Sequence, residues 1–131
     1  MSKCRIFYNI ISDGQSSAFE VCGEFLRRDN AYNVVFYTVC EGKRTRNSYA
    51  IFPGKVVFSR SGDTSYSVTL KKGETAEGVM KTAEAELPFS AKLKNCAYEY
   101  GGGEFSFDIS YDITFSTLTL NNRVCVKAVI L

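Results

Sequence analysis

The sequence predicts an all-β protein: a single antiparallel barrel or sandwich formed by 131 residues. Three observations predict this class. The chain contains 8 Tyr and 10 Phe and many β-branched residues, which favour the pleated, half-buried surface of a sheet. Apolar and polar residues alternate over many short runs, with the period of a β-strand. Turn residues such as Gly, Asn and Asp separate these runs at short intervals, as in antiparallel hairpins.

The alternation is clearest over residues 104–116, where the odd positions are apolar and the even positions are polar. A long strand with one buried face and one wet face is therefore expected there. The apolar phase changes to even positions at Leu118 and Leu120, so we expect a bulge or turn near Ser116 and Thr117.

Other strands are expected from the same reasoning, giving roughly nine or ten in all. Runs with one apolar face are residues 19–25, 65–71, 87–94 and 124–130, and runs that are apolar on both sides are residues 4–12, 32–41 and 45–52. Turns are expected at Asp13-Gly14, Arg28-Asp29-Asn30, Glu41-Gly42-Lys43, Pro53-Gly54, Gly62-Asp63, Lys72-Gly73, Gly101-Gly102-Gly103 and Asn121-Asn122.

Residues 74–86 have two interpretations. Apolar residues at positions 76, 79, 80, 83 and 87 follow the spacing of an amphipathic helix. The odd-numbered apolar phase of the next strand also extends back through Ala85 and Ala83, which favours a strand. Gly78 weakens the helix interpretation. Periodicity leaves both open.

Composition excludes several classes of protein. The length predicts one domain, residues 1–131. The absence of His excludes His-dependent catalysis and imidazole metal sites. Lys and Arg number 16 and Asp and Glu 14, and a net charge of +2 is too small for a chain that binds nucleic acid with its whole surface. The five cysteines show no paired spacing, which predicts reduced thiols. The start of the sequence lacks the apolar stretch of a leader peptide, which predicts a cytoplasmic location. No apolar run reaches roughly 20 residues, so no membrane association is expected.

The middle of the chain carries a family resemblance. KVVFSRSG at residues 55–62 is followed by a Tyr-Ser-Val strand and Lys72-Gly73, and later by ISYDI at residues 109–113. This pattern resembles the YwiB-like family of uncharacterised bacterial proteins over residues 6–129. The resemblance implies a calycin (lipocalin-like) β-barrel of about eight strands, with residues 75–86 mostly strand, and it implies no established activity. The resemblance implies about eight strands and the turns indicate nine or ten, so we expect eight to ten.

The barrel interior is the first candidate site. If the apolar positions face inward, nine large rings line it against four small residues that could leave room, which predicts a mostly filled barrel with space for a pocket at one mouth. The rings are Phe19, Phe25, Phe58, Tyr66, Phe89, Phe105, Phe107, Tyr111 and Phe115, and the small residues are Gly23, Ala83, Ala85 and Ala91.

Arg60 is the most unusual residue of this interior. Like Val56 and Phe58 it lies at an even position, so its side chain is expected on the same apolar face of the strand. A cation on an apolar face is costly unless it is paired. One interpretation is an anion-binding arginine at the mouth, with Tyr66 and Tyr111 as the wall. The other is a structural arginine where the barrel closes, which the family resemblance favours.

Basic residues at hairpin turns form the second candidate site. Alternate turns of an up-and-down sheet share an end, which places Arg27, Arg28, Lys55, Lys71 and Lys72 together, with Asp29 and Glu74. This end could bind phosphate, an acidic protein or RNA. The alternative is that these residues only keep the hairpin tips soluble. No aromatic residues interrupt the tips, so base stacking is not predicted.

The function expected from these residues is binding without catalysis. Residues 108 and 112, like residues 20 and 24, carry carboxylates on wet strand faces, and no phosphate loop, metal-ligand cluster or nucleophile elbow is present. We therefore expect a protein without cofactor or metal that binds a small, anionic molecule at one barrel mouth. The alternative is a protein- or RNA-interaction module, and the two-sided apolar strands additionally predict a homodimer.

Overall fold

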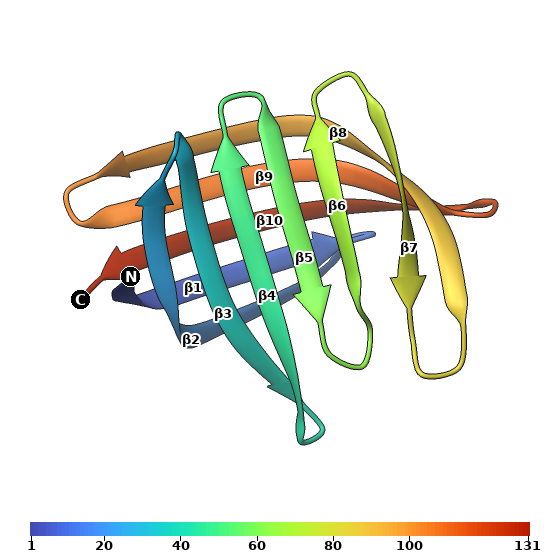
Figure 1. Ribbon diagram of the computed structural model, residues 1–131, viewed down its shortest axis with the longest axis horizontal. Coiled ribbons are helices and arrows are strands. Elements are labelled where there is room, and N and C mark those ends of the chain that lie inside the picture. The colour runs from blue at the N-terminus through green and yellow to red at the C-terminus, as the bar shows by residue number, and fades with distance from the viewer.

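The computed structural model describes the backbone of residues 1–131 and every side chain except that of Cys40. Ten antiparallel strands form one sheet in the order β6-β5-β4-β3-β2-β1-β10-β9-β8-β7, which curls into a nearly closed barrel (Figure 1). The strands are β1 (Ser2–Ser12), β2 (Gln15–Arg28), β3 (Ala31–Cys40), β4 (Lys43–Phe52), β5 (Lys55–Ser61), β6 (Tyr66–Lys71), β7 (Thr75–Lys81), β8 (Glu86–Gly101), β9 (Glu104–Phe115) and β10 (Leu118–Ile130).

The all-β class is confirmed, and the strand number is the upper end of the expected range. Residues 74–86 form β7, a turn and the start of β8, so the helix interpretation of this segment is wrong. None of the described residues forms a helix long and apolar enough to cross a membrane.

The barrel is flattened into two layers whose strands cross at a steep angle (Figure 1). Strands β3 to β7 form one layer, and β8, β9, β10 and β1 form the other. The long strands β2 and β8 connect the layers. β2 pairs with β1 from Gln15 to Phe25 but with β3 only from Gly23 to Arg28. Similarly, β8 pairs with β7 from Glu86 to Lys92 and with β9 from Ser90 to Gly101.

The core consists of the inward-facing alternate residues of both layers. Stacked and tilted rings run through it, with centroid distances of 6.1 Å for Phe36–Tyr49, 5.9 Å for Tyr49–Phe58 and 5.2 Å for Phe58–Tyr111. Such ring pairs contribute beyond the area they bury. Phe105 is completely buried at the other end of this aromatic core. The expectation of a barrel largely filled by aromatic side chains therefore agrees with the structure.

One part of the expected interior is wrong. Ala83 and Ala85 are exposed in the turn between β7 and β8, because the hydroxyl of Thr82 accepts the N–H of Ala85 and closes that turn. Phe19 faces inward as expected, and it is 50% exposed because its part of β2 has no β3 neighbour to cover it.

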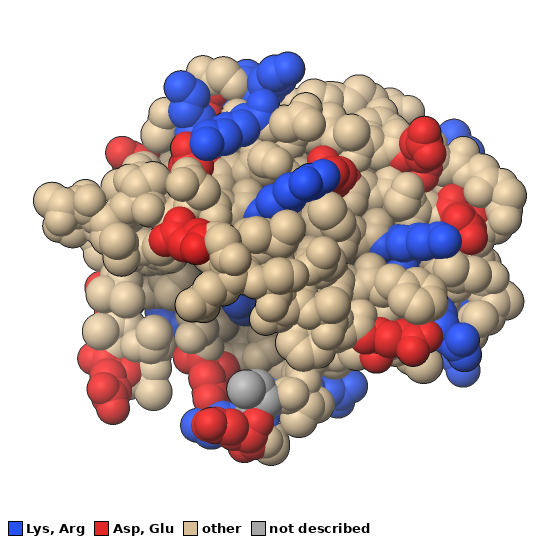
Figure 2. Space-filling model, turned by 180° about the vertical axis from the view of Figure 1, so that it is seen from behind, with Lys and Arg blue, Asp and Glu red and all other residues tan. Residues whose placement is uncertain are grey.

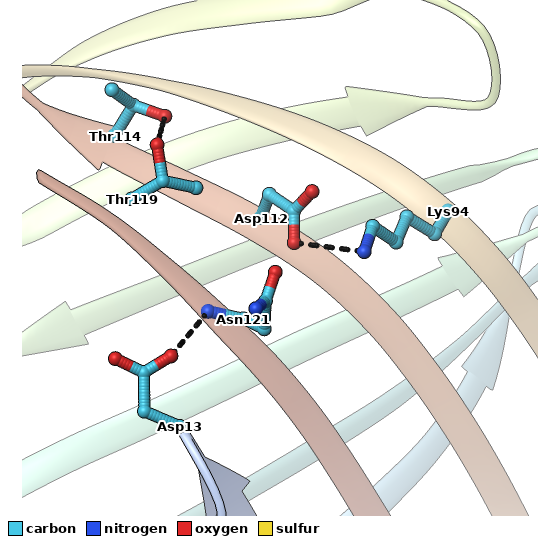
Figure 3. Close-up of polar contacts among 6 residues, drawn as sticks. All are labelled: Asp13, Lys94, Asp112, Thr114, Thr119 and Asn121. Carbon is cyan, nitrogen blue, oxygen red and sulfur yellow. Dashed lines mark hydrogen bonds and ion pairs between the residues drawn. The ribbon is translucent and has the colours of Figure 1, made fainter.

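Turns and irregularities explain the changes of apolar phase. The turn expected near Ser116 is present, and Ser116 adopts a positive φ of 54°. A register shift between Leu93 and Asn95 in β8 moves the inward phase from odd to even positions. The turn expected at Asn121-Asn122 is wrong. Both residues lie within β10, and the N–H of Asn121 donates to a carboxylate oxygen of Asp13 at 3.0 Å (Figure 3).

The barrel closes where β6 meets β7. One antiparallel bridge joins them, with two backbone hydrogen bonds of 2.8 Å between Ser65 and Lys81. The ring of Phe89 fills the space behind β7. A Cβ added to Gly78 would lie 2.6 Å from Cζ of Phe89, so the glycine is needed for this close approach.

Candidate functional site: a cation at the barrel mouth

The mouth of the barrel opens where β2 separates from β3. Gly23 lies at this crossing, and a Cβ there would be 2.7 Å from the carbonyl oxygen of Val35 and 3.1 Å from Cβ of Phe36. Only glycine allows the strands to approach so closely. On one side of this point, residues 15–22 of β2 pair only with β1, and residues 37–40 of β3 pair only with β4. An opening between the two layers follows.

This opening leads into a cavity of about 750 Å³. It is lined by residues of the β1–β2, β3–β4 and β5–β6 hairpins, among them Tyr8, Phe19, Thr38, Asn47, Arg60 and Asp63. Figure 2 shows the molecule from behind, with a hollow in its lower part and blue atoms visible inside it. The size is within the range of about 300–1,000 Å³ that small-molecule sites occupy.

Arg60 is half-buried in the wall of this cavity. Its Nε donates a hydrogen bond of 3.3 Å to Oδ1 of Asn47, and its guanidinium carbon lies 5.8 Å from the ring centroid of Tyr66. Among the described side chains, no carboxylate lies within 4.0 Å of Arg60. A guanidinium stays charged in proteins, so this charge is not neutralised by a partner.

The tyrosines around Arg60 do not supply a counter-charge. Burial raises the pKa of Tyr49 well above its ordinary value, and it also raises the pKa of Tyr111. Burial raises the pKa of Tyr66 as well, and the nearby charge of Arg60 opposes this shift without cancelling it. All three phenols are therefore neutral at physiological pH.

Asn47 orients the arginine. It is the buried polar residue of the described core, with 3% of its surface exposed. Its amide nitrogen donates to Oγ1 of Thr38 at 3.2 Å and to the carbonyl oxygen of Thr45 at 3.4 Å, which fixes its Oδ1 toward Arg60. The Nη groups of Arg60 have no hydrogen-bond partner among the described residues, yet they are not sealed from solvent. They are free to bind a ligand in the cavity.

The structure brings the predicted residues Arg60, Tyr66 and Tyr111 into one cluster. The ring of Phe58 links the two tyrosines, with centroid distances of 5.7 Å to Tyr66 and 5.2 Å to Tyr111. Tyr66 and Tyr111 do not line the cavity, however, and lie behind Arg60 rather than at the mouth. Tyr8 lines the cavity in their place.

Sequence reasoning missed Asn47 and Tyr8. The signal for Asn47 was available, because it shares its strand parity with the apolar residues Tyr49 and Ile51, just as Arg60 does with its apolar neighbours. The strand that contains Tyr8 is apolar on both sides in sequence, so its inward side was not distinguishable.

The rim of the mouth is apolar in one part and charged in another. Phe19, Tyr37 and Val39 are 50%, 40% and 69% exposed and line the cavity. Lys43 and Asp63 form an ion pair of 3.0 Å at its edge, so their charges neutralise each other. Glu41 also lines the cavity and forms no ion pair among the described residues, so Arg60 is the unpaired cation, rather than the only unpaired charge, that an incoming ligand meets.

A second hollow, of about 780 Å³, lies over the outer face of β2, β1, β10, β9 and β8. Most of the charged residues near it are paired. Arg123 binds Asp108 with a contact of 2.6 Å, and Arg5 lies 3.5 Å from Glu20. The hydrogen bond from Arg123 lowers the pKa of Asp108. Glu99 also lines this hollow and forms no ion pair among the described residues, but no unpaired cation lines it, so it is a weaker candidate for an anionic ligand than the mouth.

Polar contacts on the outer side of β8, β9 and β10 are structural (Figure 3). Lys94 lies 3.1 Å from Oδ1 of Asp112, and the hydroxyls of Thr114 and Thr119 are 3.0 Å apart. The Lys94 contact accounts for the covered Asp112 oxygen. Within the described part of the chain, no three His, Cys, Asp or Glu side chains lie close enough together to hold a metal ion.

The predicted basic residues lie at the opposite end of the front layer. The turns β2–β3, β4–β5 and β6–β7 form its upper edge in Figure 1. Lys55 and Lys71 are partners in the register of β5 and β6, and Arg28 forms an ion pair of 3.7 Å with Asp29. The topology thus places these residues along one edge, apart from Arg60.

These features define a class: a small, antiparallel ten-stranded barrel with a cation at its mouth. The chain belongs to the family described as domain of unknown function DUF1934, whose model matches residues 6–123. Its fold is that of the structure titled "Crystal structure of ywiB protein from Bacillus subtilis", with a TM-score of 0.85 and 14% identity, covering 99% of this chain and 92% of that chain.

These matches confirm the resemblance to the YwiB-like family, and the nearly closed barrel fits a calycin-like architecture. No curated protein matches the sequence significantly.

Proposed function

We propose that this chain is a cytoplasmic, non-catalytic protein that binds a small anionic molecule at the barrel mouth. The observation that carries the proposal is the half-buried Arg60, which faces a cavity of about 750 Å³ without a carboxylate partner. Withdrawing a cation from water costs several kcal/mol unless a partner compensates it. An anionic ligand supplies that partner, and so gains affinity from a charge already in place.

The shape of the ligand follows from the arrangement around Arg60. Because Nε is held by Asn47, the free edge of the guanidinium carries the Nη groups, which suit the two oxygens of a carboxylate or phosphate. The ring of Tyr66 behind the guanidinium stabilises the cation through its π face, and Tyr111 supports that wall. The exposed rings and aliphatic groups of the rim contact an apolar body of the ligand.

Native mass spectrometry of the protein purified from its own host tests this proposal. The intact protein is expected to carry an adduct that disappears on denaturation, and the released mass identifies the ligand. Arg60→Met removes the charge at similar volume and is expected to abolish the adduct. Arg46→Met is the matched control, because Arg46 is an exposed residue of the neighbouring strand β4.

Circular dichroism establishes that both variants keep the β-sheet fold. A wild-type protein without any adduct, or an adduct that survives in folded Arg60→Met, contradicts the proposal. The native mass spectra also report the oligomeric state. The homodimer expected from residues 32–41 and 45–52 stays a prediction, and a species with twice the mass of the chain would identify it.

A further inference from the structure

We infer that the basic end of the barrel binds single-stranded nucleic acid, a role separate from the proposed ligand site at the mouth. This basic end is defined by Arg27, Arg28, Lys55, Lys71 and Lys72, with Asp29 and Glu74 as its carboxylates. Its formal charge is 5 − 2 = +3, against +2 for the whole chain. The positive charge of the protein is therefore concentrated at this end, which is a condition for attracting phosphates.

The cations of this end are arranged in a row. The three hairpin tips that carry them are neighbours along one edge of the front layer (Figure 1). Adjacent tips are two strands apart, a spacing of about 10 Å from the distance between paired strands. A hollow of about 430 Å³ connects the tips, with Asn30 and Phe52 in its lining beside Lys55 and Lys71. An extended chain can follow this row across the sheet edge.

Lys55 and Lys71 are directly opposite each other in the register of β5 and β6. Like charges in this position destabilise a sheet. Among the described side chains, no carboxylate lies within 4.0 Å of either ammonium group. The Nζ of Lys55 instead lies 4.2 Å from the ring centroid of Phe52. The pair costs stability when the protein is alone, and an anion between the two ammonium groups relieves that cost.

Tyrosine rings lie beside Arg27, another cation of this end. The guanidinium of Arg27 lies over two rings, 5.3 Å from the centroid of Tyr32 and 5.5 Å from that of Tyr100. Tyr98 extends the cluster, with its centroid 5.6 Å from that of Tyr32. Tyr100 is 44% exposed. The bend of β8 brings Tyr98 and Tyr100 to this end, so aromatic rings are present there although none interrupts the hairpin tips in sequence.

The combination of rings and cations favours nucleic acid over an acidic protein. An acidic peptide requires only the positive charges. An unpaired base additionally stacks on an exposed tyrosine or on the plane of an arginine, and Tyr100 and Arg27 offer both surfaces together. Unstacked bases that can lie on these rings are available in a single strand and not inside a duplex, so a single strand is the form that fits this end.

Fluorescence anisotropy with a fluorescein-labelled 12-nucleotide oligouridine tests the inference. Binding is expected at 50 mM salt and is expected to weaken steeply at 200 mM salt as counterions are released. The double variant Lys55→Gln/Lys71→Gln is expected to lose about tenfold in affinity, and the slope of log affinity against log salt falls by about one to two. Lys3→Gln/Lys127→Gln makes the same change in net charge on β1 and β10, and is expected to bind like wild type.

A second variant separates stacking from charge. Tyr100→Leu is expected to weaken oligouridine binding by about fivefold or more, the loss of one stacked base, without changing the binding of labelled polyglutamate. Arg60→Met is expected to leave oligouridine binding unchanged, so failure of the mouth proposal leaves this one intact. No binding at 50 mM salt, or equal losses in the control pair, overturns the inference. Polyglutamate binding as tight as oligouridine binding, with no effect of Tyr100→Leu, overturns it in favour of an acidic protein.

Discussion

Replacing Gly23 by alanine tests whether the mouth depends on the close crossing of β1, β2 and β3. The added Cβ would lie 2.7 Å from the oxygen of Val35 and 2.8 Å from Cγ1 of Ile6, where ordinary contacts begin near 3.4 Å. Overpacking of this kind costs about 1–3 kcal/mol. Alanine returns about 0.5–1 kcal/mol by restricting the unfolded chain. The expected net loss of stability is therefore about 1.5 kcal/mol.

This loss corresponds to a measurable shift of the melting temperature. An unfolding entropy of about 2.1 cal/mol/K per residue gives about 0.28 kcal/mol/K for this chain, so the melting temperature falls by about 5 °C. Thermal unfolding followed by circular dichroism measures it. Gly101→Ala is the control, because a Cβ there meets nothing within 4 Å and the backbone does not need a positive φ. If Gly23→Ala melts with wild type and Gly101→Ala, the argument from close crossing is refuted.

Three further predictions follow from the core and the outer face. Phe105→Ala removes a completely buried ring and is expected to cost about 3–5 kcal/mol, seen as a lower urea midpoint; an unchanged midpoint contradicts the core assignment. Burial raises the pKa of Cys4 to about 11, above its ordinary value of 9.0, so the stability that the buried thiol contributes is full below pH 9 and is lost as pH rises to 11. In Cys4→Ala, the urea midpoint should therefore depend less on pH over that range. Peptide mass spectrometry should show that iodoacetamide labels the exposed Cys22 before Cys4. Arg123→Gln is expected to raise the lowered pKa of Asp108 in a carboxyl NMR titration, and no shift would mean that their hydrogen bond is absent in solution.

The elements that sequence predicted well are those whose pattern is local. The alternation over residues 104–116 identifies β9 almost to its ends, because each inward residue is marked by its own side chain. The turn at Ser116 follows from the change of phase on its two sides. The register shift after Leu93 was missed, although Cys96, Tyr98 and Tyr100 beyond it lie at even positions and mark a change of phase. Because that run is short, the position of the irregularity depends on the pairing with β9.

The candidate sites were predictable to different degrees. A cation on an apolar strand face singled out Arg60, and the same rule applied to Asn47 would have completed the pair. Gly23 in a strand interior also carried a signal of close backbone approach. The contact of Arg27 with Tyr100 joins residues far apart in sequence through the bend of β8, and no local pattern contains that information.

The position of the two chain ends has a consequence for how the sheet assembles. The N–H of Leu131 donates to the carbonyl oxygen of Lys3 at 3.0 Å, and Figure 1 shows both ends side by side. Read from β7, the sheet order is β7-β8-β9-β10-β1-β2-β3-β4-β5-β6. Every strand therefore lies beside its neighbour in sequence except at the contact of β10 with β1. During synthesis, β1 to β6 and β7 to β9 therefore share no sheet pairing except the Ser65–Lys81 bridge until β10 emerges. A circular permutant opened between Lys71 and Thr75 would pair every strand with its sequence neighbour, and such a low contact order predicts faster folding than that of the natural chain.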